Sequence, residues 1–225
     1  MEKKADVIII GAGPGGIFCA YELLRQKPDL KVIVIEKGRS IEKRVCPKRT
    51  TLQCVGCKPC SITTGFAGAG AFSDGKLSLS PDVGGNLPEI LGYEKTAELI
   101  HESDEIYLKF GADRNVYGVD KQDVIREIRR RAIGANLKLV ECPIRHLGTE
   151  EGYKIYAKLQ KHLMDEGAEL IFNTMVEEIL VEDGKAVGVR TDKGDVYYGS
   201  EVVSAVGREG ADWFKDKCEE VGIET

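Results

Sequence analysis

The first forty residues carry the pattern that most restricts what this chain can fold into. An apolar run, ADVIII at 5–10, leads into a glycine-rich turn, GAGPGG at 11–16, and then into a segment with helical spacing of apolar residues. A second apolar run, VIVI at 32–35, ends in Glu36. This order of strand, glycine turn, helix and strand predicts a dinucleotide-binding βαβ unit.

Each glycine of the turn has its own physical reason. Gly11 allows the tight turn, Gly13 lets the backbone approach a pyrophosphate, and Gly16 lets the helix pack closely on the strand. We expect the phosphates on the unpaired N–H groups that open the helix, where Pro14 and Gly15 also lie.

Glu36 stands at the carboxyl end of the second strand, at the distance expected for a ribose-binding acid. Its carboxylate can accept both hydrogen bonds from an adenosine ribose, and its charge would repel a 2′-phosphate. We therefore expect FAD or NAD in preference to NADP.

The composition excludes several classes of function. The chain has 225 residues, 42% hydrophobic content and a net charge of −5, and its one dense basic run lies at 126–131. Nucleic-acid binding therefore lacks its electrostatic footprint, and no apolar run approaches the roughly 18 residues of a membrane span. The first strand begins almost at Met1, so we expect no targeting segment, and the odd count of seven cysteines favours a cytoplasmic protein.

The remaining pattern predicts an α/β fold with an insertion. After a long connection at 37–87, helices are expected at 94–110 and 121–132 and a strand at 137–141. A regular part follows, with a helix at 151–166, strands at 169–172, 175–182, 185–191, 195–198 and 201–205, and a helix at 211–221. We assign 1–87 and 148–225 to one Rossmann-like domain. Residues 88–147 form an inserted segment, part of an incomplete substrate domain, that adds no strand to the parallel sheet.

Three motifs together resemble the FAD-binding half of glutathione-reductase-like flavoproteins. They are the βαβ unit with Glu36, the small-residue segment GFAGAGAFSDGKL at 65–77, and VVSAVG at 202–207. The resemblance implies a Rossmann-like FAD-binding domain, with a parallel sheet, helices and an antiparallel β-meander, plus the inserted helical segment.

The same resemblance implies further cofactor contacts. The small-residue segment would let the backbone approach the flavin and pyrophosphate, VVSAVG would return the chain to the cofactor, and Val176 matches the position that meets the adenine. Arg44 would either pair with the pyrophosphate or lie in solvent, and Lys37 would cover the adenine edge or lie on the surface. The implied positions beyond the βαβ unit are Lys37, Arg44, Gly70, Ala71, Ser73, Val176, Ala205 and Gly207.

Within that superfamily the chain resembles the bacterial FAD-dependent dehydrogenases, through RVCP at 44–47, the cysteine cluster and GAGAFSDGKL at 68–77. Members of the group are commonly about twice this length, so the chain resembles their N-terminal half. The resemblance implies FAD as cofactor and a small-molecule redox substrate or electron-transfer partner, with NAD(P)H as a candidate. The charge and the short apolar runs described above exclude nucleic acid and membrane as expected partners.

Four cysteines precede the small-residue segment. Cys46, Cys54, Cys57 and Cys60 read C-x₇-C-x₂-C-x₂-C, and two-residue gaps let neighbouring thiolates reach one metal. We predict them as ligands of an iron–sulfur cluster or of zinc. A dithiol that exchanges electrons with the flavin, and thiols with a purely structural role, remain open alternatives.

These features favour an FAD-dependent oxidoreductase whose flavin carries the redox chemistry. An NAD-dependent dehydrogenase would need only the first motif. A redox-sensing or electron-carrier module would use the flavin and cysteines without turning over a small molecule. No residue is assigned a catalytic role, because neither His101 nor His146 has a partner by spacing.

Overall fold

The computed structural model describes residues 2–73 and 75–224. Contacts between Cα atoms divide the chain into two compact units. Unit 1 comprises Met1–Phe72 and Tyr156–Thr225, and unit 2 comprises Ser73–Ile155. Each unit is described separately below.

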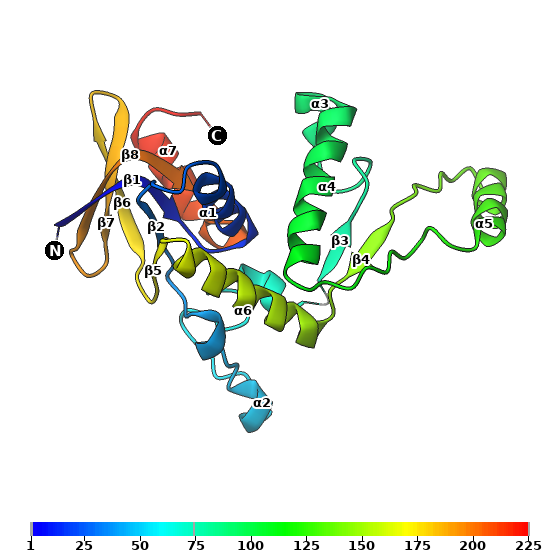
Figure 1. The fold of residues 1–225 in the computed structure, drawn as a ribbon, viewed down its shortest axis with the longest axis horizontal. Coiled ribbons are helices and arrows are strands. Elements are labelled where there is room, and N and C mark those ends of the chain that lie inside the picture. The colour runs from blue at the N-terminus through cyan, green and yellow to red at the C-terminus, as the bar shows by residue number, and fades with distance from the viewer. Residues whose placement is uncertain (1, 74, 225) are drawn as a thin grey trace. The chain divides into compact units, whose positions relative to one another are not determined.

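Unit 1 is built on a six-stranded sheet in the order β5-β2-β1-β8-β7-β6 (Figure 1). Its strands are β1 (Glu2–Ile10), β2 (Val32–Ile35), β5 (Glu169–Ile171), β6 (Val176–Glu182), β7 (Lys185–Thr191) and β8 (Val196–Ser204). Neighbours from β5 to β8 are parallel, whereas β6, β7 and β8 pair antiparallel. The expected α/β fold, a parallel sheet with an antiparallel meander, is therefore confirmed.

The two faces of this sheet are covered by different helices. On one face, α1 (Pro14–Gln26) lies against Ile9. Its neighbour α6 (Thr149–Asp165) meets it through the rings of Tyr21 and His162, whose centroids are 5.4 Å apart. On the other face, Trp213 of α7 (Ala211–Glu220) packs against a core cluster. That cluster contains Ile8, Ile10, Ile33, Ile35, Val176, Val189 and Tyr197.

Short helical turns occupy the connections of unit 1. They are η1 (Ile41–Lys43), α2 (Lys48–Thr51), η2 (Gly68–Phe72) and η3 (Arg208–Gly210). The long connection expected after Glu36 thus contains three short turns and no strand within residues 37–72.

Unit 2 contains a small antiparallel sheet, three complete helices and the first part of α6. Its elements are β3 (Lys76–Ser78), α3 (Leu87–Leu91), α4 (Tyr93–Lys109), α5 (Gln122–Gly134) and β4 (Ile144–His146). β3 pairs with β4, so residues 88–147 supply no strand to the six-stranded sheet. The assignment of this segment to a substrate domain stays a prediction.

A buried ion pair joins two elements of unit 2. Arg145 of β4 donates from Nε and Nη2 to Asp104 of α4, at 2.5 and 2.7 Å, and the side chains are only 5% and 8% exposed. Nη1 of Arg145 also donates to the carbonyl of Asp113 at 2.5 Å. A single guanidinium therefore ties β4 to α4 and to the chain that follows it.

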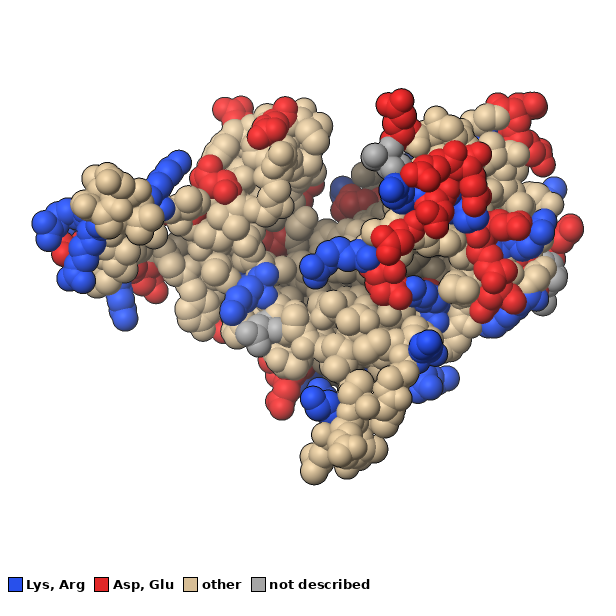
Figure 2. All heavy atoms as spheres, turned by 180° about the vertical axis from the view of Figure 1, so that it is seen from behind, with Lys and Arg blue, Asp and Glu red and all other residues tan. Residues whose placement is uncertain are grey.

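The basic run at 126–131 lies on α5, which buries no residue. Figure 2 shows Lys and Arg side chains around this helix with Asp and Glu among them. The ion pairs Arg126 with Asp123 and Arg130 with Glu127 account for this mixture. No helix within the described residues has the length and apolar character needed to cross a membrane.

Two expectations about strands are wrong. Residues 137–141 do not form a strand, and the strand of this region is β4 instead. The runs at 195–198 and 201–205 are one continuous strand, β8, because it pairs with β7 near its start and with β1 along its length. Pairing with β1, which continues through Gly199, overrides the break that this glycine suggests.

Candidate functional site

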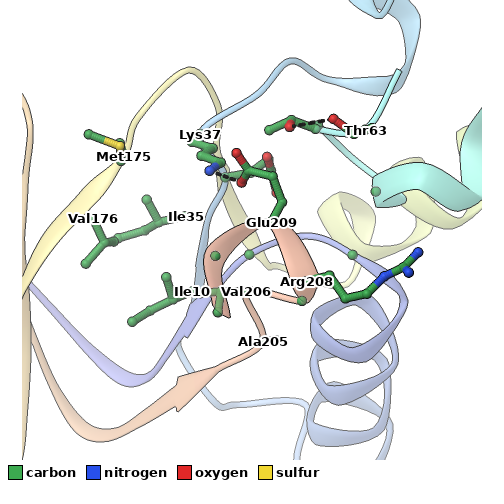
Figure 3. A pocket seen from close by; sticks show the side chains of 18 of the residues that line it. Ile10, Ile35, Lys37, Thr63, Met175, Val176, Ala205, Val206, Arg208 and Glu209 are labelled. Atoms are coloured by element: carbon green, nitrogen blue, oxygen red, sulfur yellow. Dashed lines mark hydrogen bonds and ion pairs between the residues drawn. The ribbon is translucent and has the colours of Figure 1, made fainter. Parts of the chain in front are cut away.

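A cavity of about 570 Å³ lies in unit 1 where β1, β2 and β8 end (Figure 3). The carboxyl ends of parallel strands are where open α/β sheets bind their ligands, and the volume suits a small-molecule site. Of the residues predicted from the sequence, those lining the cavity are Gly11, Gly13, Pro14, Glu36, Lys37, Val176, Ala205 and Gly207.

The glycines of the turn serve two different purposes. A Cβ on Gly16 would lie 2.0 Å from the carbonyl oxygen of Gly11, and one on Gly11, whose φ is +98°, would lie 2.7 Å from that of Ala205. These two glycines let the turn, α1 and β8 approach one another. A Cβ on Gly13 would meet no atom within 4 Å, so this position keeps open space beside the cavity that it lines.

The start of α1 leaves backbone donors available. Gly13 caps the helix without a side-chain hydrogen bond, and Pro14 occupies the first turn. The first N–H groups of a helix have no intrahelical acceptor, and the helix dipole makes this end attractive to anions. Gly15 and Gly16 lie in that first turn, and neither lines the cavity.

Glu36 lies directly after β2 and is 6% exposed. Its Oε2 accepts a hydrogen bond from the N–H of Ala12, and its Oε1 accepts one from the N–H of Gly38, both at 2.8 Å. Each carboxylate oxygen has a second lone pair, so the group can bind two hydroxyls while it holds the glycine turn.

Apolar side chains form one wall of the cavity. Ile10 and Ile35, the last residues of β1 and β2, lie close to Val176, the first residue of β6, with Met175 beside them (Figure 3). Trp213 of α7 also lines the cavity, and its indole N–H donates to the carbonyl of Glu177 at 3.3 Å. Such a wall can accept the flat face of an aromatic base.

Charged side chains also line the cavity. Lys37 forms an ion pair with Glu209 of η3, drawn as a dashed line in Figure 3. Burial lowers the pKa of Lys37, whereas the nearby charge of Glu36 works against that shift, and contact with Glu209 also favours the ammonium form. Arg208, next to Glu209, lines the cavity as well.

Arg44 has a different role from the expected one. It is 4% exposed and does not line the cavity. Its guanidinium donates at 2.6–3.1 Å to the carbonyls of Ser61, Ile62, Phe66 and Gly68. Burial lowers the pKa of Arg44 to about 10, against the opposing charges of Glu36 and Cys60. With four donors used on carbonyls, Arg44 shapes the loop at 61–68 and has no place in the lining of the cavity.

The small-residue segment lines the cavity with residues that precede the predicted ones in the sequence. Gly65, Gly68 and Ala69 line it, whereas Gly70 and Ala71 do not. Ala71 is buried in η2, and a Cβ on Gly70 would lie 3.1 Å from the hydroxyl of Tyr156. Ser73 belongs to unit 2, where its hydroxyl accepts a hydrogen bond from the N–H of Gly75 at 3.1 Å.

The predicted metal site receives no support from the structure. Cys46, Cys54, Cys57 and Cys60 are all free thiols, and no three His, Cys, Asp or Glu side chains within the described residues are grouped to hold a metal. Two-residue spacing allows thiolates to converge but does not force them to do so. Here Cys54 and Cys60 are exposed.

Cys60 nevertheless differs from the other cysteines of the cluster. Hydrogen bonds from the backbone amides of Thr63 and Ile62, and then from the Thr63 hydroxyl, lower the pKa of its thiol, with a smaller contribution from the charge of Arg44. Thr63 and Thr64 line the cavity, and the N–H of Thr64 donates to the carbonyl of Cys60 at 2.9 Å.

Several lining residues were not predicted from the sequence. Thr63 and Thr64 directly precede the small-residue segment, and Arg208 and Glu209 directly follow VVSAVG. Polar residues just beyond the carboxyl end of a parallel strand are a signal that could have found the second pair. Trp213 carries no local signal, since only the packing of α7 brings it to the cavity.

Sequence comparisons match either the N-terminal βαβ unit or most of the chain. A sequence profile of the Thi4 family matches residues 2–42. Thiamine thiazole synthase of Coprinopsis cinerea is 53% identical over 34 residues, which are 15% of this chain and 11% of that protein. An uncharacterized protein of Clostridium beijerinckii is 27% identical over 191 residues, which are 82% of this chain and 27% of that protein.

Solved structures resemble the chain over almost its whole length. The match to L-amino acid deaminase from Proteus vulgaris has a TM-score of 0.56 at 17% identity and covers 100% of this chain and 51% of that one. The match to 3-ketosteroid-delta4-(5alpha)-dehydrogenase from Rhodococcus jostii RHA1 has a TM-score of 0.58 at 17% identity. It covers 95% of this chain and 48% of that one. Glycine oxidase from Geobacillus kaustophilus matches with a TM-score of 0.54 at 16% identity, covering 99% and 59%. The chain thus spans about half the length of these proteins.

Proposed function

We propose that the cavity of unit 1 binds FAD and that the protein functions as an FAD-dependent oxidoreductase. The observation that carries this proposal is the position of Glu36, whose buried carboxylate holds the glycine turn and keeps lone pairs for a ribose at the end of β2. The resemblance of the fold to oxidases and dehydrogenases supports the same assignment.

The residues of the cavity fit the adenosine diphosphate half of the cofactor. The wall of Ile10, Ile35 and Val176 suits the adenine, and Glu36 suits the ribose. Open space at Gly13, which lines the cavity at the positive end of the α1 dipole, suits the diphosphate. FAD when bound supplies the redox chemistry, and these side chains bind and orient it.

The proposal is tested by titrating the purified chain with FAD, NAD and NADP. Trp213 is the one tryptophan of the chain and lines the cavity, so its fluorescence should fall on binding. We expect FAD to bind more tightly than NAD, and NADP to bind least because Glu36 repels the 2′-phosphate. Tighter binding of NAD than of FAD would favour an NAD-dependent dehydrogenase, and no binding of any dinucleotide would refute the proposal.

A second candidate function is a flavin and cysteine redox module without small-molecule turnover. The exposed Cys60, with its lowered pKa and its link to the cavity wall at Thr63 and Thr64, favours this candidate. The decisive measurement is the number of free thiols before and after photoreduction of FAD bound to the oxidised protein. An increase of two would support the module, and an unchanged number would exclude a dithiol that exchanges electrons with the flavin.

A further inference from the structure

Two basic side chains, Lys37 and Arg208, line the cavity, and only Lys37 forms an ion pair with another side chain of the described residues. Lys37 forms the ion pair with Glu209. Among the described residues, the side chain of Arg208 has no hydrogen bond or ion pair. The guanidinium of Arg208 is therefore available to a ligand.

Arg208 is held near the start of α1 by the backbone that precedes it. Ala205 touches the glycine turn, since a Cβ on Gly11 would lie 2.7 Å from its carbonyl oxygen and one on Gly15 would lie 4.0 Å from its Cβ. Gly207, with φ of +61°, then turns the chain into η3. In Figure 3 the Arg208 side chain extends away from Lys37 and Glu209, on the side of the cavity where α1 begins.

We infer that Arg208 binds the diphosphate group of the dinucleotide, an inference that rests on the proposed function. A guanidinium has a planar fork of donors that matches two phosphate oxygens, and it stays charged at neutral pH. The diphosphate carries about two negative charges, whereas the end of α1 supplies only about half a positive charge. Arg44 cannot make up the difference, because its donors are used on the carbonyls of the loop at 61–68.

The ion pair of Lys37 and Glu209 contributes to this arrangement. Glu209 is the immediate neighbour of Arg208, and an unpaired carboxylate there would compete with phosphate for the guanidinium or repel the phosphate directly. Because Lys37 binds Glu209, the carboxylate is neutralised and directed away from Arg208. The pair thus keeps Arg208 free for the anion.

The test compares three ligands that share adenosine: adenosine itself, ADP and FAD. Their dissociation constants are measured by calorimetry for the wild-type chain, Arg208→Gln, Arg208→Lys and a matched control, Arg190→Gln. Arg190 is an exposed cation of β7 that pairs with Glu178 and does not line the cavity. The control therefore loses the same charge away from the proposed contact.

We expect Arg208→Gln to weaken ADP and FAD about tenfold or more and to leave adenosine within about twofold, because a charged hydrogen bond to phosphate is lost. Arg208→Lys should lose less, since it keeps the charge without the fork. Arg190→Gln should bind all three ligands like the wild type. The difference in ADP affinity between Arg208→Gln and the wild type should become smaller at high salt, because screening weakens the contact between the guanidinium and the phosphate.

Two results would overturn the inference alone. Unchanged binding of ADP and FAD to Arg208→Gln would show that the guanidinium makes no contact with the diphosphate. An equal loss for adenosine and ADP would indicate a general change in the cavity. Failure of the wild-type chain to bind FAD is a distinct result, which would refute the proposed function and with it the role of Arg208.

Discussion

The carboxylate of Glu36 satisfies two backbone donors, the N–H groups of Ala12 and Gly38, in a place where little water reaches them. Replacing it with alanine leaves both donors buried and unpaired. We expect Glu36→Ala to lower the free energy of unfolding by roughly 2–4 kcal/mol, because each unsatisfied group costs about 1–3 kcal/mol. Urea unfolding of the ligand-free protein measures this loss.

The matched control for that experiment is Glu22→Ala. Glu22 lies on α1 and pairs with Arg25 at the surface, so its removal should cost less than about 1 kcal/mol. An equally small cost for Glu36→Ala would mean that water replaces the carboxylate, and the structural part of its role would be refuted.

The exposed thiol of Cys60 should react at lower pH than an ordinary cysteine. Amide hydrogen bonds from Thr63 and Ile62 favour its thiolate, which is the reactive form. We expect iodoacetamide to label Cys60 faster than the exposed Cys54 at neutral pH, because the lowered pKa of Cys60 increases its thiolate fraction. Peptide mass spectrometry after timed labelling measures both rates, and Thr63→Val, which removes one donor, should reduce the difference.

Single residues were predictable where local backbone geometry decides their role. Gly11, Gly13 and Glu36 lie in a short segment whose strand, turn and helix all follow from nearby residues. Arg44 was not predictable in this way, because its partners are carbonyls 17 to 24 residues further along the chain. Which carbonyls point at a guanidinium depends on the folded loop.

At the scale of elements, the junction of β1 with α1 contains one glycine that the fold requires, Gly16, and one that only ligand binding would require, Gly13. Gly13 has φ of −73°, which any residue can adopt, and a Cβ there meets no atom within 4 Å. Gly13→Ala should therefore leave the thermal midpoint nearly unchanged while it weakens ADP binding about tenfold or more, because the methyl group occupies the space of the approaching phosphate. Differential scanning fluorimetry and calorimetry measure the two effects.

Gly16→Ala is the complementary variant. Its Cβ would lie 2.0 Å from the carbonyl oxygen of Gly11, so the backbone has to move. We expect this variant to lose about 1–3 kcal/mol of stability, as overpacked positions do. If Gly13→Ala instead destabilised the protein and bound ADP normally, the open space at Gly13 would have no part in binding.

The elements themselves were largely predictable because their periodicity is strong. α4, α6 and α7 follow the expected helical spacing within a few residues. β8 was divided in two by the turn residues at 199–200, whereas its pairing with β1 and β7 keeps it extended. The pairing with β1 joins residues nearly 200 positions apart, such as Ile8 and Val202, and leaves no local trace in the sequence.

At the scale of the whole molecule, we expect a destabilising substitution in one unit to leave the unfolding midpoint of the other unit unchanged. The buried pair of Arg145 and Asp104 lies within unit 2, and removal of one partner leaves the other charge buried. We expect Asp104→Ala to destabilise unit 2 by about 3–5 kcal/mol. Far-ultraviolet circular dichroism should show an early loss of helix, whereas the fluorescence of Trp213, which lies in unit 1, should keep its midpoint.

Asp165→Ala is the control, since Asp165 forms an exposed pair with Lys161 in unit 1 and its loss should cost less than about 1 kcal/mol. A parallel shift of the Trp213 midpoint in Asp104→Ala would show that the units unfold as one. The extent of unit 2 was not visible in the sequence. It starts at Ser73 because β3 pairs with β4 and Gly75 packs on Leu147, contacts that span about 70 residues.

The order of strands in the sheet also has a consequence for synthesis on the ribosome. β1 emerges well before β8, one of its two neighbours in the sheet, where Val202 pairs with Ile8. At about 5–20 residues per second, roughly 10–40 s pass before that partner is made. During this time one edge of an apolar strand is open to other nascent chains, which is the condition under which chaperones act. All of unit 2 is translated within that interval, so it is in a position to fold before the central sheet of unit 1 can close.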